Sequence, residues 1–252
     1  MEWASVGYVL SVKKHGETSA IIDILTRDQG RHAGLVRGGV SKRLRPILQP
    51  GNKVQVEWHA RLSEYLGTFK VEALSARAAE VMEDRLMLSA LNAMTAMAKE
   101  TLPEREVHSR VYDAFEILLN NLDDPDIWPV LYVQWEAGLL QALGYGLDFS
   151  VCASTGANDQ LTHVSPRSGR AVSASAAEPY LDKLFVLPAF MIGSPMATPI
   201  DIANGLKLTG YFLETRLQWG VNRTLPEARA QMIARLVEEG RAVSLAAKGS
   251  NH

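Results

Sequence analysis

The chain has 252 residues and a mass of 27.7 kDa, with 47% hydrophobic and 21% charged residues, a composition typical of folded globular proteins. Charged residues interrupt every apolar stretch before the roughly 20 residues that a membrane-spanning helix needs, and the single cysteine excludes an intramolecular disulfide or a multi-cysteine metal site. The first lysines follow the N-terminal apolar run, the reverse of a signal peptide. We therefore expect a cytoplasmic protein that does not enter a membrane.

Short segments with strand character fill the first 78 residues. In one of them Val54, Val56 and Trp58 alternate with polar residues, the period of a strand with one buried face. Five strands are predicted, at about residues 5–13, 19–26, 31–37, 53–61 and 67–74. Five short strands in so few residues favour a small closed barrel, and the OB-fold is the commonest such barrel that binds single strands.

The charge changes sign along the chain. Residues 1–78 contain 12 Lys and Arg against 7 Asp and Glu, whereas residues 79–252 contain 14 against 21. This asymmetry indicates that the first part faces a polyanion. We place a domain boundary near Ala78, between an OB-fold nucleic-acid-binding domain of residues 1–78 and a helical domain of residues 79–252.

After Ala78 the spacing of apolar residues becomes helical. The first predicted helix carries apolar residues three and four positions apart and ends before Pro103; they are Met82, Leu86, Ala90, Ala93 and Met97. Further helices are predicted at about residues 107–122, 127–143, 198–220 and 224–240. Between them, a segment at about residues 146–178 is rich in small and polar residues and is expected to form an inserted hairpin or knuckle. The fold class is therefore α+β and multidomain.

The segment from Gly30 to Gln49 is the most informative for function. It contains no acidic residue and five cationic ones, namely Arg31, Arg37, Lys42, Arg43 and Arg45. Cationic side chains on a loop can follow phosphates, and the release of counterions then gives affinity that does not depend on base sequence. A solubilising surface loop is the alternative, but the predicted barrel and the divided charge favour nucleic-acid binding.

Aromatic and acidic residues elsewhere in the sequence suggest other chemistry. Four aromatic residues could stack on bases, although Trp58 lies on an apolar strand face and is expected in the core; they are Tyr8, Trp58, Tyr65 and Phe69. The acidic group 123–126 lies between two predicted helices, which favours a loop in which Asp126 caps the next helix over a divalent-metal site. No phosphate loop, nucleophile elbow or HExxH motif is present, so we expect no catalytic residue, no metal and no other cofactor.

Several short motifs occur in order over almost the whole chain. They are GETS at 16–19, ILTRDQG at 24–30, VRGG at 36–39, LQPG at 48–51, EAGLLQALG at 136–144, CASTG at 152–156 and VSPRSGRAV at 164–172. Together they resemble the bacterial RecO family of recombination mediators, in particular its alphaproteobacterial branch. The resemblance implies an OB-fold followed by a helical domain.

The same resemblance implies function and partners. RecO proteins bind single- and double-stranded DNA, anneal complementary strands, contact the C-terminal tail of single-strand-binding protein, and act with RecR to load RecA, without hydrolysing ATP themselves. We expect the five cations above to contact phosphates, with Lys70 as a weaker candidate. A basic pocket for the acidic tail is expected in the helical domain, with Arg216 and Arg223 as candidates.

One departure from the family pattern concerns metal. Many RecO proteins bind zinc through two Cys-x-x-Cys pairs in the knuckle, whereas here Cys152 stands alone. Thr155 takes the place of its first partner, and Ser173 falls near the second pair. Because hydroxyl groups are poor zinc ligands, we predict a degenerate knuckle that binds no metal and is held by hydrogen bonds and packing.

Two other hypotheses remain open at this point. One is an RNA-binding OB-fold protein, which would favour the strand that carries 2′-hydroxyl groups. The other is an enzyme with a site between the barrel and the helices, using Cys152 or the acidic group 123–126, whose side chains would then titrate abnormally in a pocket.

Overall fold

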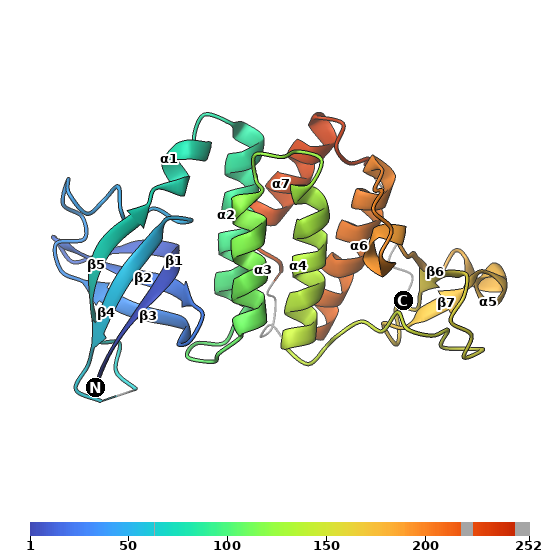
Figure 1. The fold of residues 1–252 in the computed structure, drawn as a ribbon, viewed down its shortest axis with the longest axis horizontal. Coiled ribbons are helices and arrows are strands. Elements are labelled where there is room, and N and C mark those ends of the chain that lie inside the picture. The colour runs from blue at the N-terminus through green and yellow to red at the C-terminus, as the bar shows by residue number, and fades with distance from the viewer. Residues whose placement is uncertain (63, 218–223, 245–252) are drawn as a thin grey trace. The chain divides into compact units, whose positions relative to one another are not determined.

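The computed structural model describes residues 1–62, 64–217 and 224–244 (Figure 1). Contacts divide the chain into two compact units: Met1–Asp123 with Pro226–Met232, and Asp124–Leu225 with Ile233–His252. The first unit continues past the change from strands to helices near Ala78, because α2 contacts β1 and α3 contacts β2. None of the helices within the described ranges is long and apolar enough to span a bilayer.

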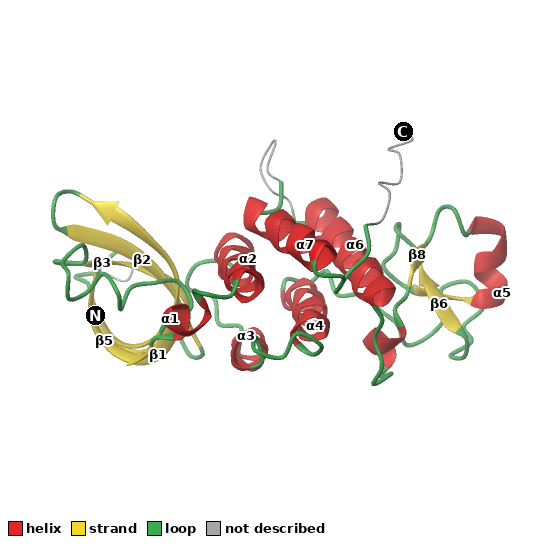
Figure 2. Ribbon diagram, turned by 90° about the horizontal axis from the view of Figure 1, so that it is seen from above, coloured by secondary structure: helices red, strands yellow, loops and turns green. Residues whose placement is uncertain are grey.

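The first unit begins with five strands that close into a barrel, which Figure 2 shows as a ring. The strands are β1 (Glu2–His15), β2 (Ser19–Thr26), β3 (Gly30–Val36), β4 (Lys53–His59) and β5 (Thr68–Ser75). Their order around the barrel is β1-β2-β3-β5-β4, and all pairs are antiparallel except β3 with β5. The predicted five-stranded barrel is confirmed.

Side chains on one face of each strand point into the barrel and form its core. The buried positions Val54, Val56 and Trp58 of β4 follow the predicted period of two. Ile22 and Ile24 of β2 join the same core. The polar positions between them face away from the interior.

The helices within the described residues follow the barrel. They are α1 (Arg77–Val81), α2 (Arg85–Thr101), α3 (Ser109–Asn120), α4 (Trp128–Ala142), α5 (Ala174–Ala177), α6 (Pro199–Arg216) and α7 (Glu227–Glu238), with 3-10 turns η1 (Glu178–Tyr180) and η2 (Ala189–Ile192). The expected N-cap of α6 is present as a capping box between Thr198 and Asp201. The end predicted near residue 220 lies outside the described residues.

One predicted helix begins later than its apolar spacing indicates. Met82 is 64% exposed and follows the short helix α1, so it does not belong to α2. Asp84 starts α2 by accepting a hydrogen bond from the Met87 backbone N–H at 2.8 Å. An N-cap carboxylate therefore sets the boundary, and the apolar period alone misses it.

The segment at 146–178 contains the expected hairpin. Its strands β6 (Leu161–Val164) and β7 (Ala171–Ser173) pair antiparallel, and β8 (Phe185–Val186) adds a third strand on the other side of β6. Cys152 is buried and packs with Val172, Ala177 and Leu184 in a small core of its own.

Candidate nucleic-acid interface

Residues 37–52, between β3 and β4, form a loop that we call the basic loop. Leu44 and Leu48 anchor it in the barrel core. The side chain of buried Asn52 donates hydrogen bonds to the carbonyls of Pro46 and Ile47 at 2.8 and 3.1 Å. The same side chain accepts one from the Ala78 backbone N–H at 3.0 Å. The backbone of the loop is thus tied down from inside while its polar side chains face out.

Six exposed cations gather on this loop and at the adjoining end of β1. None of them forms an ion pair within the residues that the structure describes. We call this set the cationic face; it comprises Lys13, Lys14, Arg37, Lys42, Arg43 and Arg45. Four of these residues were predicted from the sequence. Lys13 and Lys14 were missed, because they belong to the hairpin end that the fold brings beside the loop, where the Val40 N–H donates to the Thr18 carbonyl at 3.2 Å.

The cationic face points away from α3. At one end of β2, Arg27 pairs with Asp113 of α3 at 2.8 Å. Ser19 begins the same strand at the other end, which eight extended residues place about 25 Å away. Figure 1 shows the basic loop and the turn between β1 and β2 at the end of the barrel farthest from α2 and α3.

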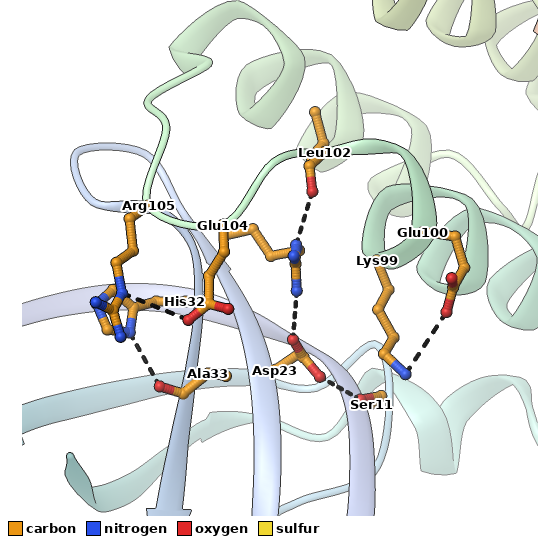
Figure 3. Close-up of polar contacts among 10 residues, drawn as sticks. Ser11, Asp23, His32, Ala33, Lys99, Glu100, Leu102, Glu104 and Arg105 are labelled. Carbon is orange, nitrogen blue, oxygen red and sulfur yellow. Dashed lines mark hydrogen bonds and ion pairs between the residues drawn. The ribbon is translucent and has the colours of Figure 1, made fainter. Parts of the chain in front are cut away.

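Arg31 differs from the other predicted contact residues. Its guanidinium pairs with Asp23 at 2.6 Å and donates through Nε to the Leu102 carbonyl at 2.8 Å. Figure 3 labels its two partners, Asp23 on the barrel and Leu102 at the end of α2, so the guanidinium joins these two elements. Because this cation is mostly buried and already paired, its geometry favours a structural role over contact with a phosphate.

Lys70 keeps a more accessible position. It pairs with Glu57 at 3.2 Å, but both side chains are more than half exposed. Exposed ion pairs of this kind are worth about 0–1 kcal/mol. Lys70 can therefore exchange its carboxylate partner for a phosphate at small cost.

A groove runs along the barrel beside the cationic face. Its volume is about 880 Å³. It is lined by residues of β1, β4 and β5, by Val36 at the end of β3, and by Arg37, Arg43 and Leu44 of the basic loop. Trp3, Trp58 and Phe69 pair across three neighbouring strands and supply the rings of this groove, which we call the aromatic groove.

The rings of the aromatic groove pack against one another and against His32 of the barrel. Trp58 and Phe69 are almost fully buried, whereas Trp3 is only partly buried and stacks on Trp58 with ring centroids 5.8 Å apart. His32 of β3 packs edge-on against Trp58 at 4.8 Å, and burial lowers the pKa of its imidazole. Trp3 is thus the ring of this row that remains accessible for stacking.

The aromatic residues suggested from the sequence as stacking platforms lie in different environments. Trp58 is in the core, as expected, and Phe69 is there too. The suggestion that Tyr8 stacks on bases is wrong, because the residue is buried and its hydroxyl donates to Glu116 of α3 at 2.7 Å. Tyr65 is 52% exposed but does not line the groove. Trp3 was missed, since its position opposite Trp58 depends on the pairing of β1 with β4.

The acidic group between α3 and α4 serves the local structure. Asp123 pairs with Arg77 at 3.2 Å, and Asp126 pairs with Arg241. The backbone N–H groups of Asp126 and Ile127 donate to the Asp124 carboxylate at 3.0 and 3.2 Å. The expectation that Asp126 caps the helix is wrong: no side chain caps α4, and the Asp124 carboxylate instead holds the turn that precedes it. No group of three or more His, Cys, Asp or Glu among the described residues could hold a metal ion.

Cys152 meets hydroxyl groups at the places where the family resemblance would imply further cysteines. The backbone N–H and the Oγ of Ser173 approach its sulfur at 3.3 and 3.4 Å. Burial raises the pKa of the Cys152 thiol, but hydrogen bonds from Ser173 and Thr155 outweigh that effect and lower the pKa. The predicted neighbours of Cys152 are therefore brought together, and they supply donors suited to hydrogen bonding.

Of the two arginines expected in a protein-partner pocket, Arg216 lies within the described residues. Arg216 donates to the Arg167 carbonyl at 2.6 Å and lies over the ring of Phe212 at 5.8 Å. Arg223 lies outside the described residues.

Comparison with known proteins identifies the family. The model for "Recombination protein O N terminal" matches residues 1–77, and that for "Recombination protein O C terminal" matches residues 82–225. The chain belongs to the RecO family. Its two matched parts correspond to the barrel and to most of the helical region that follows.

Curated RecO proteins match nearly end to end. The DNA repair protein RecO of Hyphomonas neptunium is 49% identical over 240 residues, covering 94% of this chain and 98% of the relative. That of Ruegeria sp. is 46% identical over 234 residues, covering 92% and 97%. That of Rhodospirillum centenum is 48% identical over 237 residues, covering 93% and 94%. The chain is therefore a DNA repair protein, and the family resemblance inferred from its motifs is confirmed.

Proposed function

We propose that this RecO protein captures single-stranded DNA on the barrel and anneals it to a complementary strand. The observation that carries the proposal is the cationic face beside the aromatic groove. Unpaired cations can neutralise phosphates, while an accessible ring can stack on any base without reading its identity. Neither step needs a nucleotide cofactor or a metal, and no catalytic residue is assigned.

The proposal includes the partners implied by the family. Annealing takes place on strands coated by single-strand-binding protein, whose C-terminal tail this protein contacts, and RecR joins it to load RecA. Duplex DNA is bound through the same electrostatic attraction. The phosphate contacts are assigned to Arg37, Lys42, Arg43 and Arg45, with Lys70 in support and Lys13 and Lys14 added from the fold. Arg31 instead holds the barrel to the end of α2.

The first test removes four cations from the basic loop. We expect the variant Arg37→Ala/Lys42→Ala/Arg43→Ala/Arg45→Ala to bind a labelled single strand more weakly, with a salt dependence of log K that is shallower by about 3, since each neutralised phosphate contributes about 0.7. Fluorescence anisotropy at salt concentrations from about 50 to about 200 mM measures the slope of log K against log salt concentration. Annealing of strands coated with single-strand-binding protein should fall in parallel, without nucleotide or added metal.

The matched control removes four exposed cations that lie outside the barrel. Arg85, Arg110, Arg167 and Lys183 form no ion pair within the described ranges, and the variant with Ala at all four carries the same change in net charge. It should bind the single strand with nearly the wild-type slope. Equal slopes for the two variants would contradict a DNA surface on the barrel. A strong preference for matched RNA in competition would support the RNA-binding alternative.

A further inference from the structure

A second hollow lies on the barrel and differs from the aromatic groove. Its volume is about 430 Å³. Its lining residues come from the end of β1, the start of β2 and the basic loop; they are Val12, Lys14, Ala20, Gly39, Val40, Arg45, Leu48 and Gln49. Two of these are cations, and none is acidic or aromatic. We call this site the cationic hollow.

The basic loop separates the two sites. They share no lining residue: the aromatic groove takes residues 2–4 of β1, whereas the cationic hollow takes Val12 and Lys14. Within the loop, Arg37 and Arg43 line the groove and Arg45 lines the hollow. One short segment thus supplies cations to two different sites.

The chemistry of the two sites is complementary. The groove combines cations with the partly exposed ring of Trp3, so it can hold phosphates and stack bases. The hollow offers Lys14 and Arg45 beside aliphatic side chains, of which Val12 is 40% exposed. Without an aromatic ring it can hold phosphates but gives bases no stacking surface. A strand held there keeps its bases free to pair.

We propose that the cationic hollow binds the phosphate backbone of a second DNA strand while the first occupies the aromatic groove. The basic loop then carries cations between two polyanions that would otherwise repel each other, and base pairing forms beside it. This inference rests on the proposed function and adds to it a division of labour: the groove captures a strand, and the hollow presents its complement.

The test compares two variants that each lose two cations. Lys14→Ala/Arg45→Ala empties the hollow of charge, and Arg37→Ala/Arg43→Ala removes the same charge from the groove. Binding of one labelled single strand is measured by anisotropy, and annealing of two bare complementary strands is measured by energy transfer between end labels at limiting protein. Circular dichroism and thermal melting check the fold. Lys14→Gln/Arg45→Gln repeats the hollow test with side chains of greater length.

The two variants should separate capture from annealing. We expect the hollow variant to lose clearly less single-strand affinity than the groove variant, whose lost cations lie beside the stacking ring, and to anneal about 10-fold more slowly than wild type. The groove variant should lose both. Equal losses of single-strand affinity in the two variants, or unchanged annealing by the hollow variant, would overturn the second site. A wild-type protein that neither binds nor anneals would instead overturn the proposed function.

Discussion

At the scale of single residues, Trp3 is the accessible member of an otherwise buried row. It stacks on Trp58 and lies edge-on to Phe69 and His32, each within 6 Å between ring centroids. These neighbours fix the plane of its ring before any ligand arrives. A fixed ring loses little rotamer freedom when a base stacks on it.

Replacing Trp3 tests this role. We expect Trp3→Ala to weaken single-strand binding by about 1–3 kcal/mol, the contribution of one base–aromatic stack, while leaving the salt dependence unchanged. Trp3→Phe should restore part of the affinity. Tyr65→Ala removes an exposed ring outside the groove and should bind normally. If the two alanine variants bound equally well, Trp3 would have no contact with the bases.

The residues of the candidate interface were predictable only where a local signal exists. Arg37, Lys42, Arg43 and Arg45 stand out as a run of positive charge without acids. Lys14 lacks such a run, and its place beside the loop depends on the turn between β1 and β2. Arg31 shares the charge pattern, yet a carboxylate eight positions away and a distant carbonyl occupy it. Composition records the charge of a side chain and cannot record its partner.

At the scale of elements, α3 is fastened to the barrel through Glu116. Its carboxylate accepts hydrogen bonds from Lys53 of β4 at 2.6 Å and from Tyr8 of β1 at 2.7 Å. Those two bonds lower the pKa of Glu116 below its ordinary value of 4.5, and burial opposes them in part. One side chain therefore joins a helix to two neighbouring strands.

Because the pKa of Glu116 is shifted, the stability that its contacts contribute depends on pH. Because the folded pKa of Glu116 is lowered, its stabilising contribution is complete above pH 4.5 and is lost as the pH falls through the folded pKa. We expect Glu116→Gln to lower the free energy of unfolding by about 1 kcal/mol at pH 7, since the partners are partly exposed. The difference from wild type should shrink below pH 4.5.

Urea unfolding at a series of pH values measures that difference. Glu83→Gln, an exposed substitution at a residue without an ion pair among the described residues, serves as the control and should show little effect at any pH. A gap for Glu116→Gln that stays constant to pH 3 or widens would contradict the role assigned to the carboxylate.

The elements themselves were largely predictable, because period and turn chemistry act locally. All five strands and the longer helices appear close to the expected residues. The failures occur where a side chain overrides the pattern: Asp84 delays α2 beyond Met82, and Asp124 holds the turn before α4, where Asp126 was expected to cap the helix. The closure of the barrel through a parallel pairing of Leu35 with Thr68 is a long-range contact that no local pattern encodes.

At the scale of the whole molecule, the cations of the barrel fall into two groups, those that form ion pairs and those that do not. The other cations of the barrel that are paired hold strands or helices together, as Arg27, Arg31 and Lys53 do. The six cations of the cationic face form no ion pair within the part of the chain that the structure describes. Removing a cation of the first kind should affect stability, whereas removing one of the second should affect binding.

The knuckle gives a prediction about metal. We expect the protein to be isolated with well under one equivalent of zinc and to keep its melting temperature and annealing activity after treatment with EDTA. Cys152 is the sole cysteine, and its close neighbours are the hydroxyl groups of Ser173 and Thr155, which bind zinc poorly. Elemental analysis and thermal melting, with and without chelator, check this. Melting at a clearly lower temperature after chelation would contradict it, because structural zinc contributes directly to folding.

The way Asn52 holds the basic loop bears on the rate of the proposed strand capture. Its amide fastens the turn at Pro46 and Ile47, and Leu44 and Leu48 are sunk in the core, so the cations stand on a backbone that is already ordered. Binding then requires no folding of the loop, and little conformational entropy is lost on association. For the proposed capture we therefore expect an encounter rate set by diffusion and electrostatic attraction, with the protein acting as a preformed template.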